Sequence, residues 1–485
     1  MKKVITYSLL ALLALSLPAC ESLVEGLNKD PNNPTDASAE LMLTGAELAN
    51  ITIHEGHTAR LSGLWSGYFT GVDRQYKDLY TYNANGATFD QIWQNVYYGV
   101  LEQTNQIIAK SEQVNNRLVI GIAKVLQAHA IGTAAACWGD VPYREAAQIR
   151  DFPNPTFDPQ AQVYADVQAL LSEALEELTS GIGTSPGVAD IHFGGDAAKW
   201  AEVAHTLKAR FYLHTRAFDL AYQESLQGVS VPANSMMAPH GNTVGANENM
   251  YYTFVARSRA GDMNSEGAYV TTLLNPDHAN YRGDAKTDES ARFNYNFMNL
   301  GALSVTDGLV PNYRPIAATD SMRGFIAQSA AFPLVTYQEN LLTQAEAGAR
   351  SMDFATGLAA LNEYRAYLNA GGYLDASYQQ HYPLRYDAYA EADFAAGGMA
   401  NPDGLSAADA LLDEILEERY VSFIGQKLGF YDLRRTQKET VGIKLTPVTG
   451  SVIPQRMIYS QSEINSNTSA PSPVPDLFVP TPLNQ

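Results

Sequence analysis

The sequence predicts a mainly α-helical fold, in which tetratricopeptide-like helix pairs form a scaffold that carries one long, loop-rich excursion. Apolar residues recur at helical spacing through most of the chain, and Gly, Pro and Asn separate the helical segments. Small residues such as Ala128 and Ala204 lie on helix faces, as expected where the two helices of a repeat pack closely. Residues 226–335 are instead rich in Gly, Asn, Pro, Ser and Tyr, and so long an irregular stretch within a domain is usually functional.

The helical segments begin at Ala39 and carry recognisable start signals. Thr88-Phe89-Asp90-Gln91 has the pattern of a capping box, and Asp158-Pro159 provides a cap residue followed by Pro at the first helical position. Residues 118–136 are apolar on most sides, which predicts a helix buried in the core. The other expected helices comprise residues 92–108, 163–178, 200–213, 268–274, 336–349, 357–370 and 407–423.

Residues 39–485 are expected to form a single domain, in which residues 466–485 are an irregular C-terminal strap. A chain of this length is long enough to bury a large core. The sequence has two cysteines, Cys20 and Cys137, and Cys20 belongs to the export signal described next. Cys137 is then the only thiol, so no intramolecular disulfide is available and the core must provide the stability.

The first twenty residues have the order of a secretory signal. Two lysines give a positive start, an apolar run follows as far as Leu17, and small residues close the segment. The apolar run of roughly 14 residues is shorter than the about 20 that cross a membrane, so it is not a transmembrane helix. Leu17 and Ala19 before Cys20 resemble a bacterial lipobox. This resemblance implies that residues 1–19 are removed as a signal peptide. It also implies that Cys20 is acylated, with palmitate among the acyl groups.

Residues 20–38 are then expected to be a lipid-anchored tether, with a turn-rich stretch at residues 30–36. Two or more acyl chains hold a protein on a membrane far more durably than one. The alternative is an ordinary secreted protein in which a cysteine stands at position 20 by chance.

The charge balance excludes one class of partner. The chain has 32 basic and 52 acidic side chains, a net charge of −20, and loss of Lys2 and Lys3 with the signal peptide makes it −22. Such a surface repels phosphate backbones, so nucleic-acid binding is not expected. It also lacks a polybasic patch for anionic lipids, which leaves the acyl chains as the contact with the membrane.

Two stretches combine aromatic rings with Asn, Asp and Arg, the residue types that stack on sugar rings and hydrogen-bond to their hydroxyls. They comprise residues 65–86 and 249–297. The alternative is that these rings fasten long loops to the scaffold. The candidate ligand-binding residues are Trp65, Tyr76, Tyr80, Tyr82, Asn83, Tyr251, Tyr281, Arg282, Tyr295 and Asn296.

Signals for catalysis or for metal binding are weak. The sequence contains no phosphate-binding loop of the Gly-x-x-x-x-Gly-Lys-Ser/Thr type. His54-Glu55-Gly56-His57 is one residue short of the zinc-binding spacing His-Glu-x-x-His, so no metal site and no cofactor are expected. A carboxylate pair for glycoside hydrolysis stays open, because the many acidic residues allow such a pair. A lipid-anchored glycoside hydrolase and a periplasm-facing scaffolding lipoprotein are therefore alternatives to a binding protein.

Short segments in a fixed order carry a resemblance to a known family. They include Leu27–Pro34, Ile92-Trp93-Gln94, Asn105–Ile108, Trp138–Tyr143, Leu207–Arg210, Thr336–Glu339, Ile415–Arg419, Asp432–Arg435 and Pro454-Gln455-Arg456. Together with the lipobox, this order resembles the SusD/RagB nutrient-binding lipoproteins of the Bacteroidetes outer membrane. Phe423–Gly429 lacks the Glu-Gly-x-Arg motif of starch-binding relatives, and Ser460 stands where many relatives have Pro. These two differences indicate a divergent branch of the family.

The resemblance implies a function as well as a fold. It implies a tetratricopeptide-like helical protein on the outside of the outer membrane, partnered with a SusC-type TonB-dependent transporter. Members of the family capture oligosaccharides, or in some cases oligopeptides, and do not catalyse. The resemblance places the ligand loops in the same two aromatic stretches, whereas the motifs listed above belong to the scaffold. The sequence does not decide between a glycan and a peptide.

Overall fold

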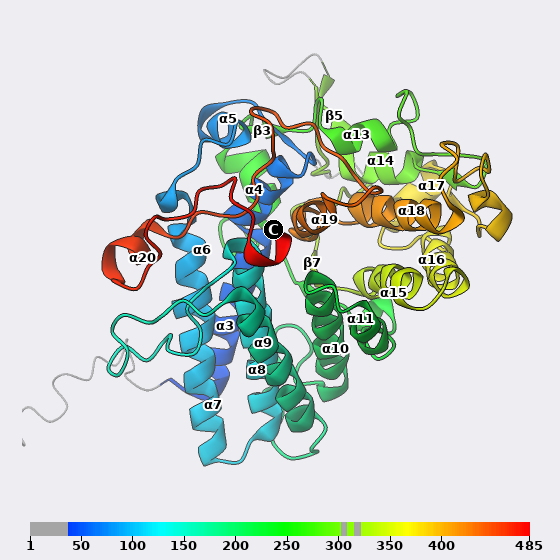
Figure 1. The fold of residues 1–485 in the computed structure, drawn as a ribbon. Helices are drawn as coiled ribbons and strands as arrows, with labels where there is room; N and C mark the ends of the chain where they lie inside the picture. Colours follow the sequence, from blue (N-terminus) through cyan, green and yellow to red (C-terminus); the bar gives the residue numbers. More distant parts are fainter. Residues whose placement is uncertain (1–36, 302–307, 315–321) are drawn as a thin grey trace, which may run out of the picture.

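The computed structural model describes residues 37–301, 308–314 and 322–485, and its architecture is mainly helical (Figure 1). The predicted signal peptide 1–19, the lipidation site Cys20 and the tether 20–38, except for its last two residues, lie outside the described residues. The fold class predicted from the sequence is confirmed. The longer helices are α3 (Ala39–Glu55), α7 (Gln103–Gln113), α8 (Arg117–Trp138), α9 (Gln160–Leu178), α10 (Ala197–His214), α15 (Tyr337–Ser351), α16 (Phe354–Asn369) and α18 (Ala407–Ser422).

Helices that follow one another in the chain pack as pairs. Helix α8 packs against α9, α10 packs against α11 (Phe218–Ser225), and α15 packs against α16. Because α15 also contacts α11 and α18, the pairs continue into one another as a curved array (Figure 1). This is the arrangement expected of tetratricopeptide-like pairs.

Helix α8 is the central helix of the scaffold. Of the described helices it is the one long and apolar enough to span a membrane, and 89% of its apolar window is buried within the fold. Its glycines let the neighbouring helices approach closely. A Cβ on Gly132 would lie 2.2 Å from Cζ of Phe211 on α10, and one on Gly121 would lie 2.7 Å from Leu178 on α9. Close packing of this kind explains why residues 118–136 are almost uniformly small or apolar.

Two predicted start signals are used differently from the expectation. The capping box is formed by Asn85 and Thr88, three residues earlier than predicted, and each side chain accepts a hydrogen bond from the other residue's backbone N–H. Asp158 does not cap α9, because its carboxylate accepts from the backbone N–H groups of Tyr143 and Arg144. The backbone N–H of Gln160 is instead bound by Asp140, at 2.8 Å.

Two short antiparallel strand pairs, β1–β3 and β4–β8, tie the loop-rich excursion to the rest of the chain, and two more pairs form within it. Strand β3 (Met263–Asn264) pairs with β1 (Thr70–Gly71), and β2 (Met236–Ala238) pairs with β7 (Phe332–Val335). Strand β4 (Thr287–Asp288) pairs with β8 (Arg385–Tyr386), and β5 (Phe297–Asn299) pairs with β6 (Leu309–Pro311). The excursion also contains the short helices α12 (Met250–Tyr252), α13 (Tyr269–Leu274) and α14 (Ser290–Asn296).

The C-terminal part of the chain closes the end of the central helix. Arg434, on α19 (Leu428–Thr436), donates to the carbonyl oxygen of Ala136 at 2.8 Å, and Arg456 donates to that of Trp138. These bonds satisfy carbonyl groups that the last turn of a helix leaves unpaired. After α20 (Gln461–Ser466), the final residues run back over the scaffold, and the backbone N–H of Leu483 donates to the Gln160 side chain at 3.0 Å.

Candidate ligand-binding site

The two aromatic stretches singled out in the sequence meet in the structure. The β1–β3 pair joins the segment before α5 (Arg74–Tyr80) to the excursion, with Thr70 opposite Asn264. Arg74 reinforces this junction, because its guanidinium pairs with Asp262 and donates to the carbonyl oxygen of Ala260 at 3.1 Å. The two aromatic stretches, which are nearly 200 positions apart in the sequence, are thereby held next to each other.

Beside this junction lies a hollow of about 240 Å³, which we call the tyrosine hollow. Its aromatic lining comes from Tyr80 and Tyr82, at and just after the end of α5, and from Tyr269 at the start of α13. The remaining wall includes Leu445 and Val448 from the segment after α19. Three tyrosine rings around one concave surface form the kind of flat, amphipathic lining that sugar rings stack upon.

The three tyrosines are held to different degrees. Tyr82 is 6% exposed, its backbone φ is 68° and its hydroxyl accepts from the backbone N–H of Val448 at 2.9 Å, so its ring is a fixed part of the wall and the open stacking faces belong to the other two tyrosines. Tyr80 and Tyr269 are half-buried. Burial raises the pKa of the Tyr80 hydroxyl, and burial followed by the charge of Glu417 raises the pKa of Tyr269. Both hydroxyls therefore stay protonated at neutral pH and can donate to a ligand.

A second, larger hollow of about 640 Å³ adjoins the first, since both are lined by Gly267 and Thr272. We call it the polar hollow. Its lining is richer in hydrogen-bonding groups, which complement sugar hydroxyls or peptide groups. They include Thr271, Asn275, His278, Asn294, Asn299 and Tyr382.

Three of the predicted ligand residues lie mainly in the core. Trp65 is 1% exposed, reaches the tyrosine hollow only as part of its floor, and donates from its indole to Leu79 O at 3.0 Å. The hydroxyl of Tyr76 accepts from Arg60 Nε at 2.9 Å, and that of Tyr251 donates to the carbonyl oxygen of Gly425 at 2.6 Å. These rings fasten loops to the scaffold, as the alternative interpretation of the aromatic stretches expected.

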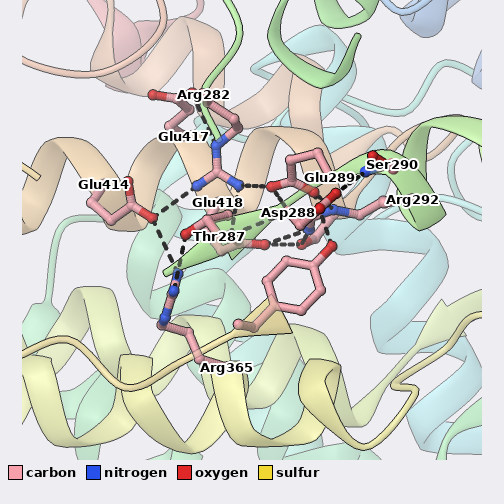
Figure 2. Close-up of polar contacts among 12 residues, drawn as sticks. Arg282, Thr287, Asp288, Glu289, Ser290, Arg292, Arg365, Glu414, Glu417 and Glu418 are labelled. Carbon is pink, nitrogen blue, oxygen red and sulfur yellow. Dashed lines mark hydrogen bonds and ion pairs between the residues drawn. The ribbon is translucent and has the colours of Figure 1, made fainter. Parts of the chain in front are cut away.

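Arg282 is surrounded by protein carboxylates, as Figure 2 shows. Its guanidinium donates to Glu289, to Glu418 at 2.9 Å, to Glu414 at 2.8 Å and to Glu417 at 3.0 Å. The side chain is 4% exposed, so it is unavailable to a ligand in this structure. It instead joins the excursion to α18, which carries the last three of these acids.

Arg282 belongs to a larger arginine–glutamate cluster. Arg292 binds Glu289 and Glu418 through contacts of 2.5 Å to each, and Arg365 lies 3.8 Å from Glu414. Tyr281 borders this cluster, with its hydroxyl accepting from the backbone N–H of Glu289 at 2.9 Å. Tyr281 and Arg282 therefore lie outside the tyrosine hollow and the polar hollow.

The other predicted residues lie in two places. Asn83 is exposed beside Tyr82 in the turn after α5. Tyr295 and Asn296 lie at the end of α14 and line a separate cavity between the excursion and the scaffold. The sequence reasoning did not select Tyr269, although it lies within the 249–297 stretch, nor the 445–453 segment. Nothing in the composition of that late segment distinguishes it from an ordinary loop.

A sequence profile decides the family. The profile of the SusD-like family, described as "Starch-binding associating with outer membrane", matches residues 31–460. The chain belongs to the SusD-like family. None of the curated proteins compared matches the sequence.

Solved SusD-like structures share the fold at low sequence identity. A SusD homolog from Bacteroides fragilis NCTC 9343 is 16% identical, with a TM-score of 0.67 over 93% of this chain and 100% of that one. A SusD/RagB family protein from Bacteroides thetaiotaomicron VPI-5482 is 19% identical, with a TM-score of 0.64 over 90% of this chain and 95% of that one. A chitin-binding SusD homolog from Flavobacterium johnsoniae is 16% identical, with a TM-score of 0.64 over 88% of this chain and 94% of that one.

Proteins of the SusD-like family bind nutrients at the outer membrane.

One sequence motif has the spacing of a catalytic site. Gly183-Thr184-Ser185-Pro186-Gly187 matches the Gly-x-Ser-x-Gly pattern of a nucleophile elbow. Ser185 nevertheless lies in the loop between α9 and α10, and its hydroxyl donates to Gly194 O at 2.8 Å. Within the described ranges, no group of three or more His, Cys, Asp or Glu side chains is arranged to hold a metal ion.

Proposed function

We propose that this chain is a surface-exposed lipoprotein that captures neutral oligosaccharides at the tyrosine hollow. It delivers them to a SusC-type TonB-dependent transporter in the same outer membrane. The observation that carries the proposal is the convergence of Tyr80, Tyr82 and Tyr269 on one hollow. These rings come from two stretches that are distant in the sequence but share the composition of a glycan site.

The neighbouring polar hollow supports an oligomeric ligand. Together the two hollows offer room for more than one sugar ring, with stacking surfaces in one and amide or hydroxyl groups such as Asn275, Asn294 and Thr272 in the other. The net charge of −20 disfavours polyanionic ligands and leaves neutral glycans unaffected. One of the similar structures is of a chitin-binding protein, so this scaffold is compatible with glycan capture.

An oligopeptide is the second candidate ligand. The exposed carboxylates of Glu266 and Asp277 line the polar hollow together with one cation, Arg314, and the negative balance would attract a basic peptide. We favour the glycan because the tyrosine hollow itself is lined by uncharged groups.

Titration calorimetry with the purified chain tests the ligand class. Chitin oligosaccharides, malto-oligosaccharides and a basic oligopeptide are compared on the wild type, Tyr80→Ala and Tyr269→Ala. Loss of one stacking ring costs about 1.4 kcal/mol, so the glycan Kd should rise about tenfold in each variant. Tyr98→Ala is the matched control, since Tyr98 is 66% exposed and lies outside both hollows.

Several results would contradict this assignment. Unchanged glycan affinity in Tyr80→Ala and Tyr269→Ala, together with a lower Tm, would mean that these rings only fasten loops. Preference for the peptide would replace the glycan as ligand. Release of reducing ends from the bound oligosaccharide would identify a hydrolase instead of a binding protein.

The place of action is tested on cells. Protease shaving of intact cells should degrade the chain, because the proposal puts its body outside the outer membrane. Full protection would favour the periplasm-facing scaffold. A TonB-dependent transporter should co-purify with the chain from detergent-solubilised outer membranes, and its absence would refute the delivery step.

A further inference from the structure

A cavity of about 250 Å³ lies between the excursion and the helical scaffold, apart from the two hollows. Its lining combines aromatic rings with side-chain amides, and we call it the amide cavity. The rings are Tyr295, Phe325, Phe332 and Tyr373, and the amides are Asn296, Gln338 and Gln426. These residues come from α14, β7 and the segment before it, the start of α15, the loop after α16 and the segment after α18. The cavity shares no lining residue with the tyrosine hollow or the polar hollow.

Two of its amides are buried without a protein partner. Gln338 is 7% exposed and Gln426 is 6% exposed. Among the residues that the structure describes, neither side-chain amide makes a hydrogen bond to the protein, and both line the cavity. Amide groups without a protein partner at the wall of a cavity are free to hydrogen-bond to whatever fills it. Amides placed in this way complement a ligand inside the cavity.

The local backbone explains why Gln426 lies there. Gly425 has a φ of 79°, a left-handed conformation that side chains rarely allow. This turn follows directly on α18, and a Cβ on Gly425 would lie 3.2 Å from the ring of Phe325, another lining residue. The glycine therefore permits both the turn that orients Gln426 and the close approach of the cavity wall.

The lining specifies the chemistry of the ligand. None of the described residues that line the cavity carries a charge, so a charged ligand would lack a counter-ion. Amides offer both donors and acceptors, as adjacent hydroxyls require, and burial raises the pKa of the Tyr295 hydroxyl, which keeps its proton. At about 30 Å³ per water molecule, the cavity has the volume of about eight waters, and it is smaller than the roughly 300 Å³ of a drug-sized pocket.

We propose that the amide cavity is a second binding site, which takes a single neutral, hydroxyl-rich ring of monosaccharide size. Such a ring is either a free sugar or the end residue of a longer glycan. Ala331, which is exposed, marks the side on which the cavity reaches the surface. The site does not depend on ligand capture at the tyrosine hollow, because no residue is common to the two.

Saturation-transfer NMR on the purified chain tests the proposal with neutral probes. Glucose, galactose and N-acetylglucosamine are compared on the wild type, Gln338→Leu and Gln426→Leu. At least one sugar should bind the wild type, and its Kd should rise about tenfold or more in each variant through lost hydrogen bonds. Replacing an unpaired buried amide by an apolar side chain of similar size should leave the Tm unchanged or higher.

Further measurements separate this site from the tyrosine hollow. Tyr80→Ala should leave the Kd for the monosaccharide at the amide cavity unchanged. Monosaccharide binding at the amide cavity is also expected if the tyrosine hollow turns out not to bind glycans. If a chitin trimer binds and the free sugars do not, and if Gln426→Leu weakens the binding of the trimer, the ligand of the cavity is the end residue of a longer glycan. A crystal soaked with the best probe should show the sugar between Tyr295 and Gln426.

The proposal would be overturned by an absence of binding for all of these probes. It would equally be overturned by equal affinities in wild type and both leucine variants, or by ordered water alone in the soaked crystal. If either leucine variant fails to fold, the wild-type soak decides.

Discussion

Substitution of Glu47 by Gln is predicted to stabilise the protein at neutral pH and to remove part of its pH dependence. Glu47 lies on α3 and is fully buried. One of its carboxyl oxygens accepts from the backbone N–H of Ile191 at 2.9 Å, and the other has no partner among the described residues when the acid is ionised. Burial, followed by the nearby charge of Asp190, raises the pKa of Glu47 to about 10.

Asp190 is committed to other donors. Its carboxylate accepts from the indole of Trp200 at 2.8 Å and from the backbone N–H groups of Gly195 at 2.7 Å, His192 at 3.0 Å and Phe193 at 3.1 Å. A protonated Glu47 can donate to this carboxylate, and a Gln at position 47 offers an N–H in the same place.

The sign and size of the effect follow from the two pKa values of Glu47. Between the ordinary value of 4.5 and the folded value of about 10, the folded state binds one more proton than the unfolded state. Stability therefore falls as pH rises through this range, by about 1.4 kcal/mol per unit. At about pH 7.5, three units above the ordinary value, the cost is about 4 kcal/mol, and Gln avoids it.

Urea unfolding of the purified chain between pH 4 and pH 8 measures the difference. The wild type and Glu47→Gln should have the same free energy of unfolding near pH 4, and the variant should be increasingly the more stable towards pH 8. Glu40→Gln is the matched control, because Glu40 is exposed on the same helix. Parallel curves for wild type and variant, or a variant that is less stable at pH 8, would refute a neutral Glu47.

Three further predictions concern the anchor and the packing. Cys20→Ala should abolish incorporation of labelled palmitate, and retained label would disprove lipidation at this residue. Arg282→Met should cost about 3–5 kcal/mol in chemical unfolding, because Glu417 loses its cation and the clustered carboxylates of Glu289, Glu414 and Glu418 share one positive charge fewer. Arg385→Met on the surface should cost less than about 1 kcal/mol, and similar losses in the two variants would contradict a stabilising cluster. Gly132→Ala should destabilise the protein by about 1–3 kcal/mol, because the added methyl group forces Phe211 aside. Gly45→Ala is the control and should be neutral or stabilising, because there is open space around its Cβ. A Gly132→Ala protein of unchanged stability would show that α8 and α10 can separate.

Long periodic segments were predictable because their signal is local. The expected helices 118–136 and 163–178 correspond to α8 (Arg117–Trp138) and α9 (Gln160–Leu178). The excursion was recognised from its composition. Helix starts were less predictable, because a distant residue such as Asp140 can supply the hydrogen bond that a local sequence pattern assigns to its own residue.

The individual site residues were harder to predict than the stretches that contain them. Tyr76 and Tyr80 are one helical turn apart on α5, yet Tyr76 is 2% exposed and packs on Phe254, whereas Tyr80 lines the tyrosine hollow. Arg282 has the composition of a ligand residue, but acids about 130 positions later in the chain surround it. Contacts of this range depend on the tertiary fold and leave no local pattern.

The closing of α8 by the C-terminal part of the chain has a consequence for the order of events during folding. The carbonyl oxygen of Ala136 accepts a hydrogen bond from Arg434, and that of Cys137 accepts one from the backbone N–H of Met457. The indole of Trp138 donates to the carbonyl oxygen of Ile458. The end of the central helix therefore cannot be completed until the chain more than 300 residues further on has folded against it. Contacts of such long sequence separation form late in folding, so the end of α8 is expected to become ordered only after the C-terminal segment has docked.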